Sequence, residues 1–169
     1  NKYHYVPLAT GREVPLEGTD MMVTPFVLSH GSNYKSTAFL VRYQSGYLLY
    51  LGDTGADTIE HSHDLLQLWQ CIAPFVQQKK LKAIFIEVSY PNEQPENQLF
   101  GHLTPKLLLD EMHVLVNLTG INAVQGLPIV ITHMKPSGNN EAIIQRQLLQ
   151  NNALQLQFIF AQQAVPLFF

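Results

Sequence analysis

The stretch Tyr47-Leu48-Leu49-Tyr50-Leu51-Gly52-Asp53-Thr54-Gly55 is the natural starting point for interpreting this chain. Its first five residues are apolar or aromatic and are bounded by glycines, a pattern typical of a short buried strand. Asp53 follows directly, so we expect its carboxylate at the carboxyl end of that strand, where ligands gather in layered α/β proteins. Three roles stay open for Asp53 at this point: a metal ligand, a general base, or the N-cap of a following helix.

The segments around this strand predict an antiparallel beginning and an alternating remainder. Met21–Leu28 and Thr37–Tyr43 are strand-like, and the second of these should form a hairpin with Tyr47–Leu51. After Asp53 we expect a helix over 58–78, a strand over 81–88, a helix from Thr104-Pro105 to about Leu118, a strand over 127–131, a helix ending near Asn151 and a strand over 156–160. This order predicts an α/β layered sheet.

Composition excludes several classes of function. The chain has 169 residues, of which 46% are hydrophobic and 14% charged, with a net charge of −3. Only 10 residues are Lys or Arg, so we expect no nucleic-acid groove. No apolar run is long enough to cross a bilayer, so we expect no membrane partner. The single cysteine, Cys71, lies in an expected helix and is interpreted as an inert core thiol, which leaves the cellular compartment open.

Ionisable side chains follow four of the expected strands. His30 comes after the first, Asp53 after the third, Glu87 ends the fourth and His133 comes after the fifth. If these strands share one sheet, the four side chains can meet at one edge. Two histidines and an aspartate suit Zn²⁺ or Mn²⁺, although a lone histidine after a strand is more often a loop residue.

A set of ordered motifs adds a family resemblance. The motifs are Val27-Leu28-Ser29-His30-Gly31, Ser36-Thr37-Ala38-Phe39-Leu40, Leu51-Gly52-Asp53-Thr54-Gly55-Ala56-Asp57, Ile86-Glu87-Val88-Ser89-Tyr90, Leu99-Phe100-Gly101-His102-Leu103-Thr104-Pro105 and Ile131-Thr132-His133-Met134-Lys135-Pro136. Together, over residues 20 to 160 or so, they resemble the class II cyclic-nucleotide phosphodiesterases of the metallo-β-lactamase superfamily. The His-Leu-Thr-Pro block is the most diagnostic. The resemblance implies a metallo-β-lactamase-like αββα sandwich.

The resemblance also implies roles for individual residues. His30 matches a ligand of one metal ion, Asp53 the carboxylate that bridges two ions, and His133 the last histidine ligand, on the other ion. Glu87 and His102 resemble the pair that related tRNA-processing nucleases place beside the leaving group, with His102 as the proton donor. The implied cofactor is two zinc ions, with manganese or magnesium less favoured.

One family motif is absent. The signature His-x-His-x-Asp-His, which supplies most of the metal ligands, belongs upstream of His30 and does not occur there. The only similar stretch, His61-Ser62-His63-Asp64, lies downstream of Asp53 on an expected helix, and we interpret it as a solvated helix face. We therefore expect residues 1–169 to form a single partial domain, mainly the C-terminal half of the sandwich. Its expected partner is the N-terminal half of the same protein, and a homodimer stays open.

The function implied by the resemblance is hydrolysis of 3′,5′-cyclic nucleotides, such as cyclic AMP or cyclic GMP, to 5′-nucleotides by a hydroxide held between two metal ions. Two alternatives remain. The chain could belong to another hydrolase of this fold, acting on a different phosphodiester, a lactone or a thioester. It could also be a non-catalytic fragment that serves as a binding or structural half. We expect the isolated 169 residues to bind metal poorly and to be inactive.

Overall fold

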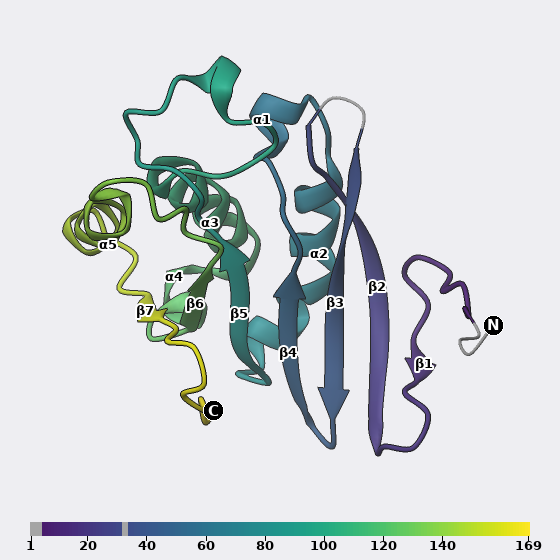
Figure 1. Ribbon diagram of the computed structural model, residues 1–169. Coiled ribbons are helices and arrows are strands. Elements are labelled where there is room, and N and C mark those ends of the chain that lie inside the picture. The colour runs from purple at the N-terminus through teal and green to yellow at the C-terminus, as the bar shows by residue number, and fades with distance from the viewer. Residues whose placement is uncertain (1–4, 32–33) are drawn as a thin grey trace.

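The computed structural model describes residues 5–31 and 34–169, and Figure 1 shows a twisted sheet with helices packed behind it. The sheet has seven strands, and their order in space equals their order in the chain. They are β1 (Val14–Pro15), β2 (Met21–Ser29), β3 (Lys35–Tyr43), β4 (Gly46–Leu51), β5 (Leu81–Glu87), β6 (Pro128–Thr132) and β7 (Gln157–Phe160). Every strand expected from the sequence is present, and β1 is a short addition at the edge.

The sheet changes character at β4. Strands β1 to β4 pair antiparallel, whereas β4 to β7 pair parallel. The expected hairpin of β3 and β4 is confirmed, with Gln44 in the turn at a positive φ of 53°. Because β2 and β4 both run opposite to β3, they run in the same direction as each other. The carboxyl ends of β2, β4, β5 and β6 therefore lie along one edge of the sheet.

Helices connect the parallel strands and cover one face. α2 (Asp64–Gln77) joins β4 to β5, α3 (Pro105–Thr119) joins β5 to β6, and α5 (Asn140–Gln150) joins β6 to β7. Each connection moves one strand in the same direction, and right-handed crossovers then place all three helices on the same side, as Figure 1 shows. The shorter helices are α1 (Asp57–Glu60), the 3₁₀ turn η1 (Glu96–Gln98) and α4 (Ile121–Val124). Within the described residues no helix is both long and apolar enough to span a bilayer.

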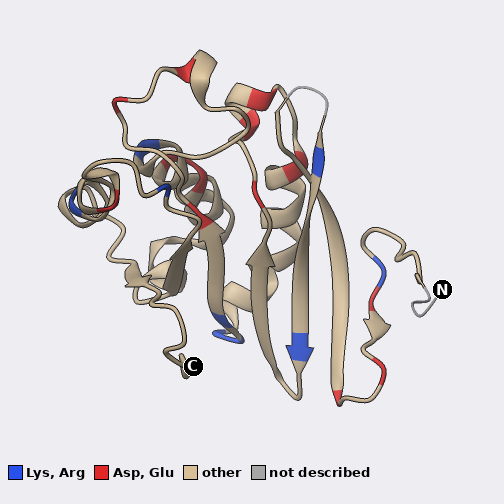
Figure 2. Ribbon diagram, viewed as in Figure 1, with Lys and Arg blue, Asp and Glu red and all other residues tan. Residues whose placement is uncertain are grey.

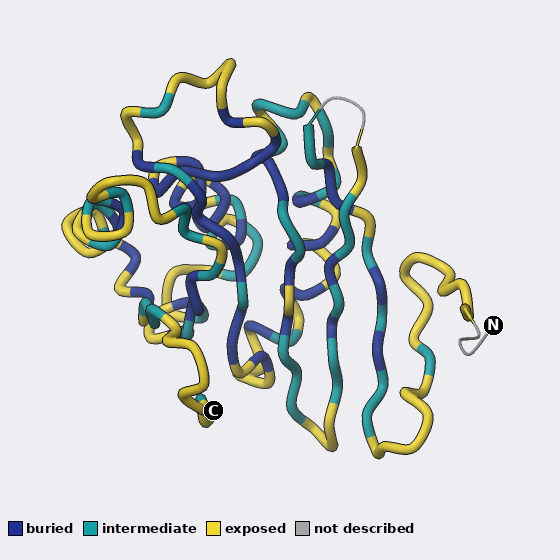
Figure 3. Tube along the Cα trace, viewed as in Figure 1, coloured by how far each residue is buried: buried dark blue, intermediate teal, exposed yellow. Residues whose placement is uncertain are grey.

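The core lies between the sheet and these helices. Alternate residues of the central strands, such as Leu49 and Ile84, are fully buried in the core shared with α2 and α3. Figure 3 shows the dark blue of buried residues along most of β5 and at intervals along β4. Trp69 of α2 is also fully buried. Its indole Nε1 donates a hydrogen bond to Glu111 of α3 at 2.9 Å, which satisfies the polar atom that burial would otherwise leave without a partner. Full burial of one such leucine or isoleucine contributes roughly 1.5–3 kcal/mol.

The opposite face of the sheet is apolar and largely open. Phe39 pairs with Tyr50, and Tyr50 pairs with Phe85, so the three side chains form a cross-strand row. Tyr50 is 51% exposed, and its ring lies 5.9 Å from that of Phe85. Phe169 near the carboxyl terminus touches this row, with its ring 5.8 Å from Phe85. No helix of the described residues lies on this face, as Figure 1 shows.

Two sequence predictions were wrong in detail. The helix expected over 58–78 is two helices, because His61 adopts a left-handed φ of 51° and ends α1. Cys71 is exposed on α2 and is no core thiol, since the apolar stripe of that helix turns away from it. The start of α3 is as expected: the amide of Leu107 donates to Thr104 Oγ1 at 3.3 Å, and Pro105 is the first helical residue.

Candidate active site

Four strand ends bring the sequence-predicted residues to one edge of the sheet. His30 directly follows β2, Asp53 follows β4 by one residue, Glu87 is the last residue of β5, and His133 directly follows β6. Figure 2 shows red segments just beyond the end of β4 and at the end of β5. His102 arrives separately, on the long loop between β5 and α3. The juxtaposition expected from the sequence is therefore present.

The side chains at this edge are close enough to act together. Ligand atoms of His30, Asp53 and His102 lie within 4.8 Å of one another. Nε2 of His133 lies 3.6 Å from Oδ2 of Asp53. The rings of His102 and His133 are 5.3 Å apart. Asp53 thus lies close to all three histidines at this edge.

Asp53 does not cap a helix. Helix α1 has Ala56 as its N-cap, and no side chain caps it. The Asp53 side chain is 38% exposed, so its carboxylate faces the open edge of the sheet. Of the three roles open from the sequence, the helix cap is excluded, and a metal ligand or a general base remains.

The loop before α3 orients His30. The Nδ1 of His30 lies 2.9 Å from the carbonyl oxygen of Gly101, so Nδ1–H donates and Nε2 keeps its lone pair. Gly101 approaches so closely that a Cβ there would lie 2.1 Å from the backbone nitrogen of Gly31. Its φ is +81°, a conformation that favours glycine. Backbone contact therefore sets the tautomer and the direction of His30, as it often does for metal-binding histidines.

Glu87 and His102 form a buried pair. Nδ1 of His102 lies 2.7 Å from Oε1 of Glu87, with only 7% and 1% of the two side chains exposed. The amide of Thr54 also donates to Oε1 at 3.2 Å, while Ser89 Oγ donates to Oε2 at 2.8 Å. The amide of Leu103 contacts Oε2 at 3.4 Å. This carboxylate therefore holds the His102 ring in place and leaves Nε2 free to face the site.

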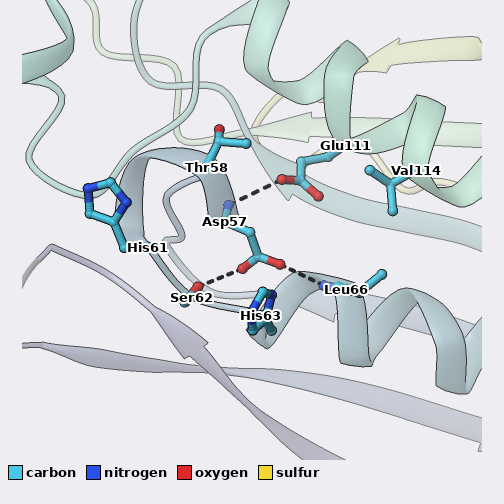
Figure 4. Close-up of a pocket in the computed structure, with 8 residues that line it drawn as sticks. All are labelled: Asp57, Thr58, His61, Ser62, His63, Leu66, Glu111 and Val114. Carbon is cyan, nitrogen blue, oxygen red and sulfur yellow. Dashed lines mark hydrogen bonds between the residues drawn. The ribbon is translucent and has the colours of Figure 1, made fainter.

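Three residues of the stretch His61–Asp64 lie elsewhere, around the pocket in Figure 4, namely His61, Ser62 and His63. These three residues form the turn between α1 and α2, whereas Asp64 is the first residue of α2, so the helix-face interpretation was wrong for the two histidines. Asp57 accepts hydrogen bonds from Ser62 Oγ at 2.6 Å and from the amide of Leu66 at 2.8 Å, which ties this turn to the start of α2. Among the described residues, His61 and His63 join no group that could hold a metal ion.

Glu111 lines the same pocket and carries a shifted pKa. Burial raises the pKa of the Glu111 carboxyl above its ordinary value, against the opposing effect of hydrogen bonds from Trp69 and from the amide of Asp57. This carboxyl joins α2, α3 and the start of α1, and we interpret it as a structural group.

Two residues at the site escaped the sequence analysis. Gly101 orients His30 through a contact across 71 positions of the chain, which no local pattern reveals. Ser89 contacts both Glu87 and His102. Its position two residues after Glu87 places it on the same side of an extended segment, and this spacing is the signal that could have found it.

The sequence is similar to a known family of enzymes. Residues 6–163 match the sequence profile of the family described as "cAMP phosphodiesterases class-II". The chain belongs to this family. It is 42% identical over 174 residues to a 3′,5′-cyclic-nucleotide phosphodiesterase of Aliivibrio fischeri, a match that covers all of this chain and 52% of that protein. It is 38% identical to a probable 3′,5′-cyclic-nucleotide phosphodiesterase of Yersinia pestis, over 82% of this chain and 41% of the relative.

Solved structures support the class II phosphodiesterase fold. The structure of unliganded yeast PDE1 superposes with a TM-score of 0.79 at 25% identity, over 92% of this chain and 47% of that one. The metallo-β-lactamase fold protein YhfI of Bacillus subtilis superposes with a TM-score of 0.55 at 11% identity, over 91% of this chain and 52% of that one, which supports the fold alone. The chain thus spans about half the length of the first of these curated relatives and somewhat less of the second.

A phosphodiesterase of the metallo-β-lactamase fold implies a divalent metal ion. The residues present fit one: His30 directs a free Nε2 toward the site, and Asp53 directs a partly exposed carboxylate. Imidazole nitrogen and carboxylate oxygen are ligands that divalent first-row metals accept.

Proposed function

We propose that this chain supplies one half of an active site that hydrolyses 3′,5′-cyclic nucleotides to 5′-nucleotides. The observation that carries the proposal is the buried Glu87–His102 pair, 2.7 Å apart, with His102 beside His30 and Asp53. A metal-binding edge with an adjacent proton donor is what cleavage of a phosphodiester needs. Membership of the class II family supports cyclic nucleotides as the substrate class.

Three residues would hold the metal. His30 and Asp53 belong to one cluster of ligand atoms, and His133 lies 3.6 Å from Asp53, so Asp53 is our candidate for a carboxylate shared by two ions. Zinc suits these nitrogen and oxygen donors better than magnesium, which prefers oxygen alone, and manganese is the next candidate. Bound divalent metal would supply a more acidic water nucleophile and would offset negative charge on the phosphoryl oxygens.

His102 would act as the proton donor. Its Nδ1–H is held by Glu87, so a proton on Nε2 can pass to the 3′-oxygen as the bond from phosphorus to that oxygen breaks. The Glu87 carboxylate stabilises the charged imidazolium before this transfer and keeps the ring oriented after it. Because His102 also lies within ligand distance of His30 and Asp53, a metal-ligand role is the competing assignment.

The open face of the sheet would take the N-terminal half of the same protein. The row of Phe39, Tyr50 and Phe85 is apolar and partly exposed, and such a contiguous face marks a contact surface. The Aliivibrio fischeri relative is about twice the length that this chain matches, which leaves a second half to cover the face. Residues 1–169 would then be a single partial domain. A second copy of this chain is the alternative occupant, and the mass of the complex in solution separates the two.

The test uses His102→Asn in the complete protein, with His61→Asn as the matched control outside the site. Metal content and the rate of cyclic AMP hydrolysis are measured for each variant. We expect His102→Asn to retain its metal and to lose about 10²-fold to 10⁴-fold in kcat, whereas His61→Asn resembles the wild type. Loss of metal from His102→Asn would instead make His102 a ligand. A wild-type protein that cleaves lactones or thioesters but no cyclic nucleotide would refute the proposed substrate.

A further inference from the structure

Ser89 lies where three segments of the site meet. The residue is completely buried. Its Oγ lies 2.8 Å from Oε2 of Glu87, 3.2 Å from Nδ1 of His102 and 3.2 Å from the carbonyl oxygen of His133. One hydroxyl therefore touches the end of β5, the loop before α3 and the segment after β6.

The Ser89 hydroxyl completes the hydrogen bonding of the Glu87 carboxylate. Nδ1–H of His102 donates to Oε1, so the single Oγ proton of Ser89 has Oε2 as its best acceptor, because that acceptor is charged and is the shortest contact. Without Ser89 Oγ, the Oε2 atom would keep only the amide of Leu103 at 3.4 Å, a weak contact. The carboxylate could then rotate, and Oε1 would no longer be fixed opposite His102.

The backbone of Ser89 and of its neighbour Val88 also fixes the segment that carries His133. His133 has a φ of +54°, in the left-handed region that residues other than glycine rarely occupy. The amide of Lys135 donates to the carbonyl oxygen of Ser89 at 3.3 Å, and the amide of Val88 donates to the carbonyl oxygen of Thr132 at 3.1 Å. From this backbone the imidazole of His133 reaches Asp53. Backbone hydrogen bonds from Val88 and Ser89 therefore hold the residues on both sides of His133.

We propose that Ser89 is a positioning residue for the reaction: its hydroxyl fixes the Glu87 carboxylate in the orientation that holds His102. The inference rests on the proposed function, because the arrangement matters only if His102 donates the proton. Ser89 itself touches no reacting atom. Its removal should therefore lower the fraction of molecules in which His102 is aligned, and should affect substrate binding much less.

The experiment compares Ser89→Ala and Ser89→Cys with Ser62→Ala in the complete protein. Ser62 is the matched control, because its hydroxyl also donates to a carboxylate, that of Asp57 at 2.6 Å, but outside the site. The measurements are kcat, KM and the pH dependence of kcat for cyclic AMP. In addition, the NMR signal of the His102 Nδ1 proton is recorded in the metal-free protein, where it reports the contact with Glu87 directly.

For Ser89→Ala we expect a fall in kcat of about 10-fold to 100-fold with KM nearly unchanged, an altered pH profile, and loss of the His102 Nδ1 signal through faster exchange. Ser89→Cys should lie between the wild type and Ser89→Ala, because a thiol is a weaker donor. It also provides the test if Ser89→Ala does not fold. A sharp Nδ1 signal and wild-type kcat in either folded Ser89 variant would overturn the proposal. If the wild type does not cleave cyclic AMP, the proposed function fails, and the NMR comparison still decides the role of Ser89.

Discussion

Replacing Gly101 with alanine tests how tightly the loop before α3 is fitted against His30. The new Cβ would lie 2.1 Å from the nitrogen of Gly31 and 2.5 Å from the carbonyl carbon of His30, and both are backbone atoms that cannot rotate away. Relieving the contact requires the two segments to separate by about 1 Å, which typically costs about 1–3 kcal/mol. The φ of +81° adds roughly 1–2 kcal/mol for any residue with a Cβ.

Gly126→Ala separates these two effects. Gly126 has a similar φ of +73°, but a Cβ there would meet no atom within 4 Å. Both variants change glycine to alanine, so the effect on the unfolded chain cancels between them. Urea unfolding should therefore show Gly101→Ala to be less stable than Gly126→Ala by about 1–3 kcal/mol. Metal affinity should fall by about 10-fold to 100-fold in Gly101→Ala alone, because His30 loses its fixed acceptor. Equal stability and equal metal affinity in the two variants would refute this reasoning.

Three further outcomes follow from other parts of the molecule. Because burial raises its pKa, the Glu111 carboxyl binds its proton more tightly in the folded state. Its contribution to stability is therefore greatest below its ordinary pKa and falls as the pH rises through the raised pKa. Urea unfolding at a series of pH values should show that Glu111→Gln weakens this pH dependence of stability. Thr104→Ala removes the side-chain cap of α3 and should lower the free energy of unfolding by about 1 kcal/mol, whereas Thr104→Ser should not. Cys71 is exposed, so its thiol should react with a thiol reagent in the native protein at a rate that low urea does not change. A thiol that reacts only after the protein unfolds would contradict the exposed position of Cys71.

Local patterns were enough to predict most of the sheet. Each apolar run bounded by turn residues became a strand, because such runs must be buried and strand length is set by the turns around them. The start of α3 at Thr104-Pro105 could also be predicted, since a hydroxyl cap and a proline at the first helical position are local signals that mark a helix start. The proximity of the four residues at strand ends could be predicted, because strands that run in the same direction have their carboxyl ends at the same edge of the sheet.

Features that depend on backbone conformation or on contacts between distant segments could not be predicted from the sequence. The break at His61 depends on a left-handed residue and on capping by Asp57, neither of which disturbs the helical periodicity of the sequence. Cys71 lies among apolar neighbours in the sequence, yet the rotation of α2 turns it toward solvent. The contact of Gly101 with His30 joins segments that only the folded sheet brings together.

The most direct test of the proposed site is Asp53→Asn in the complete protein, compared with Asp20→Asn at an exposed position away from it. Asparagine keeps the size of the side chain but removes the charge that would be shared between two ions. The measurement is the rate of cyclic AMP hydrolysis to 5′-AMP together with metal content. We expect Asp53→Asn to lose its metal and to hydrolyse cyclic AMP more than about 100-fold more slowly. Loss of a residue that only supports a metal ligand already lowers metal affinity or activity by about 10-fold to 100-fold. Wild-type metal content and hydrolysis in Asp53→Asn would contradict the assignment of this carboxylate as the bridging ligand.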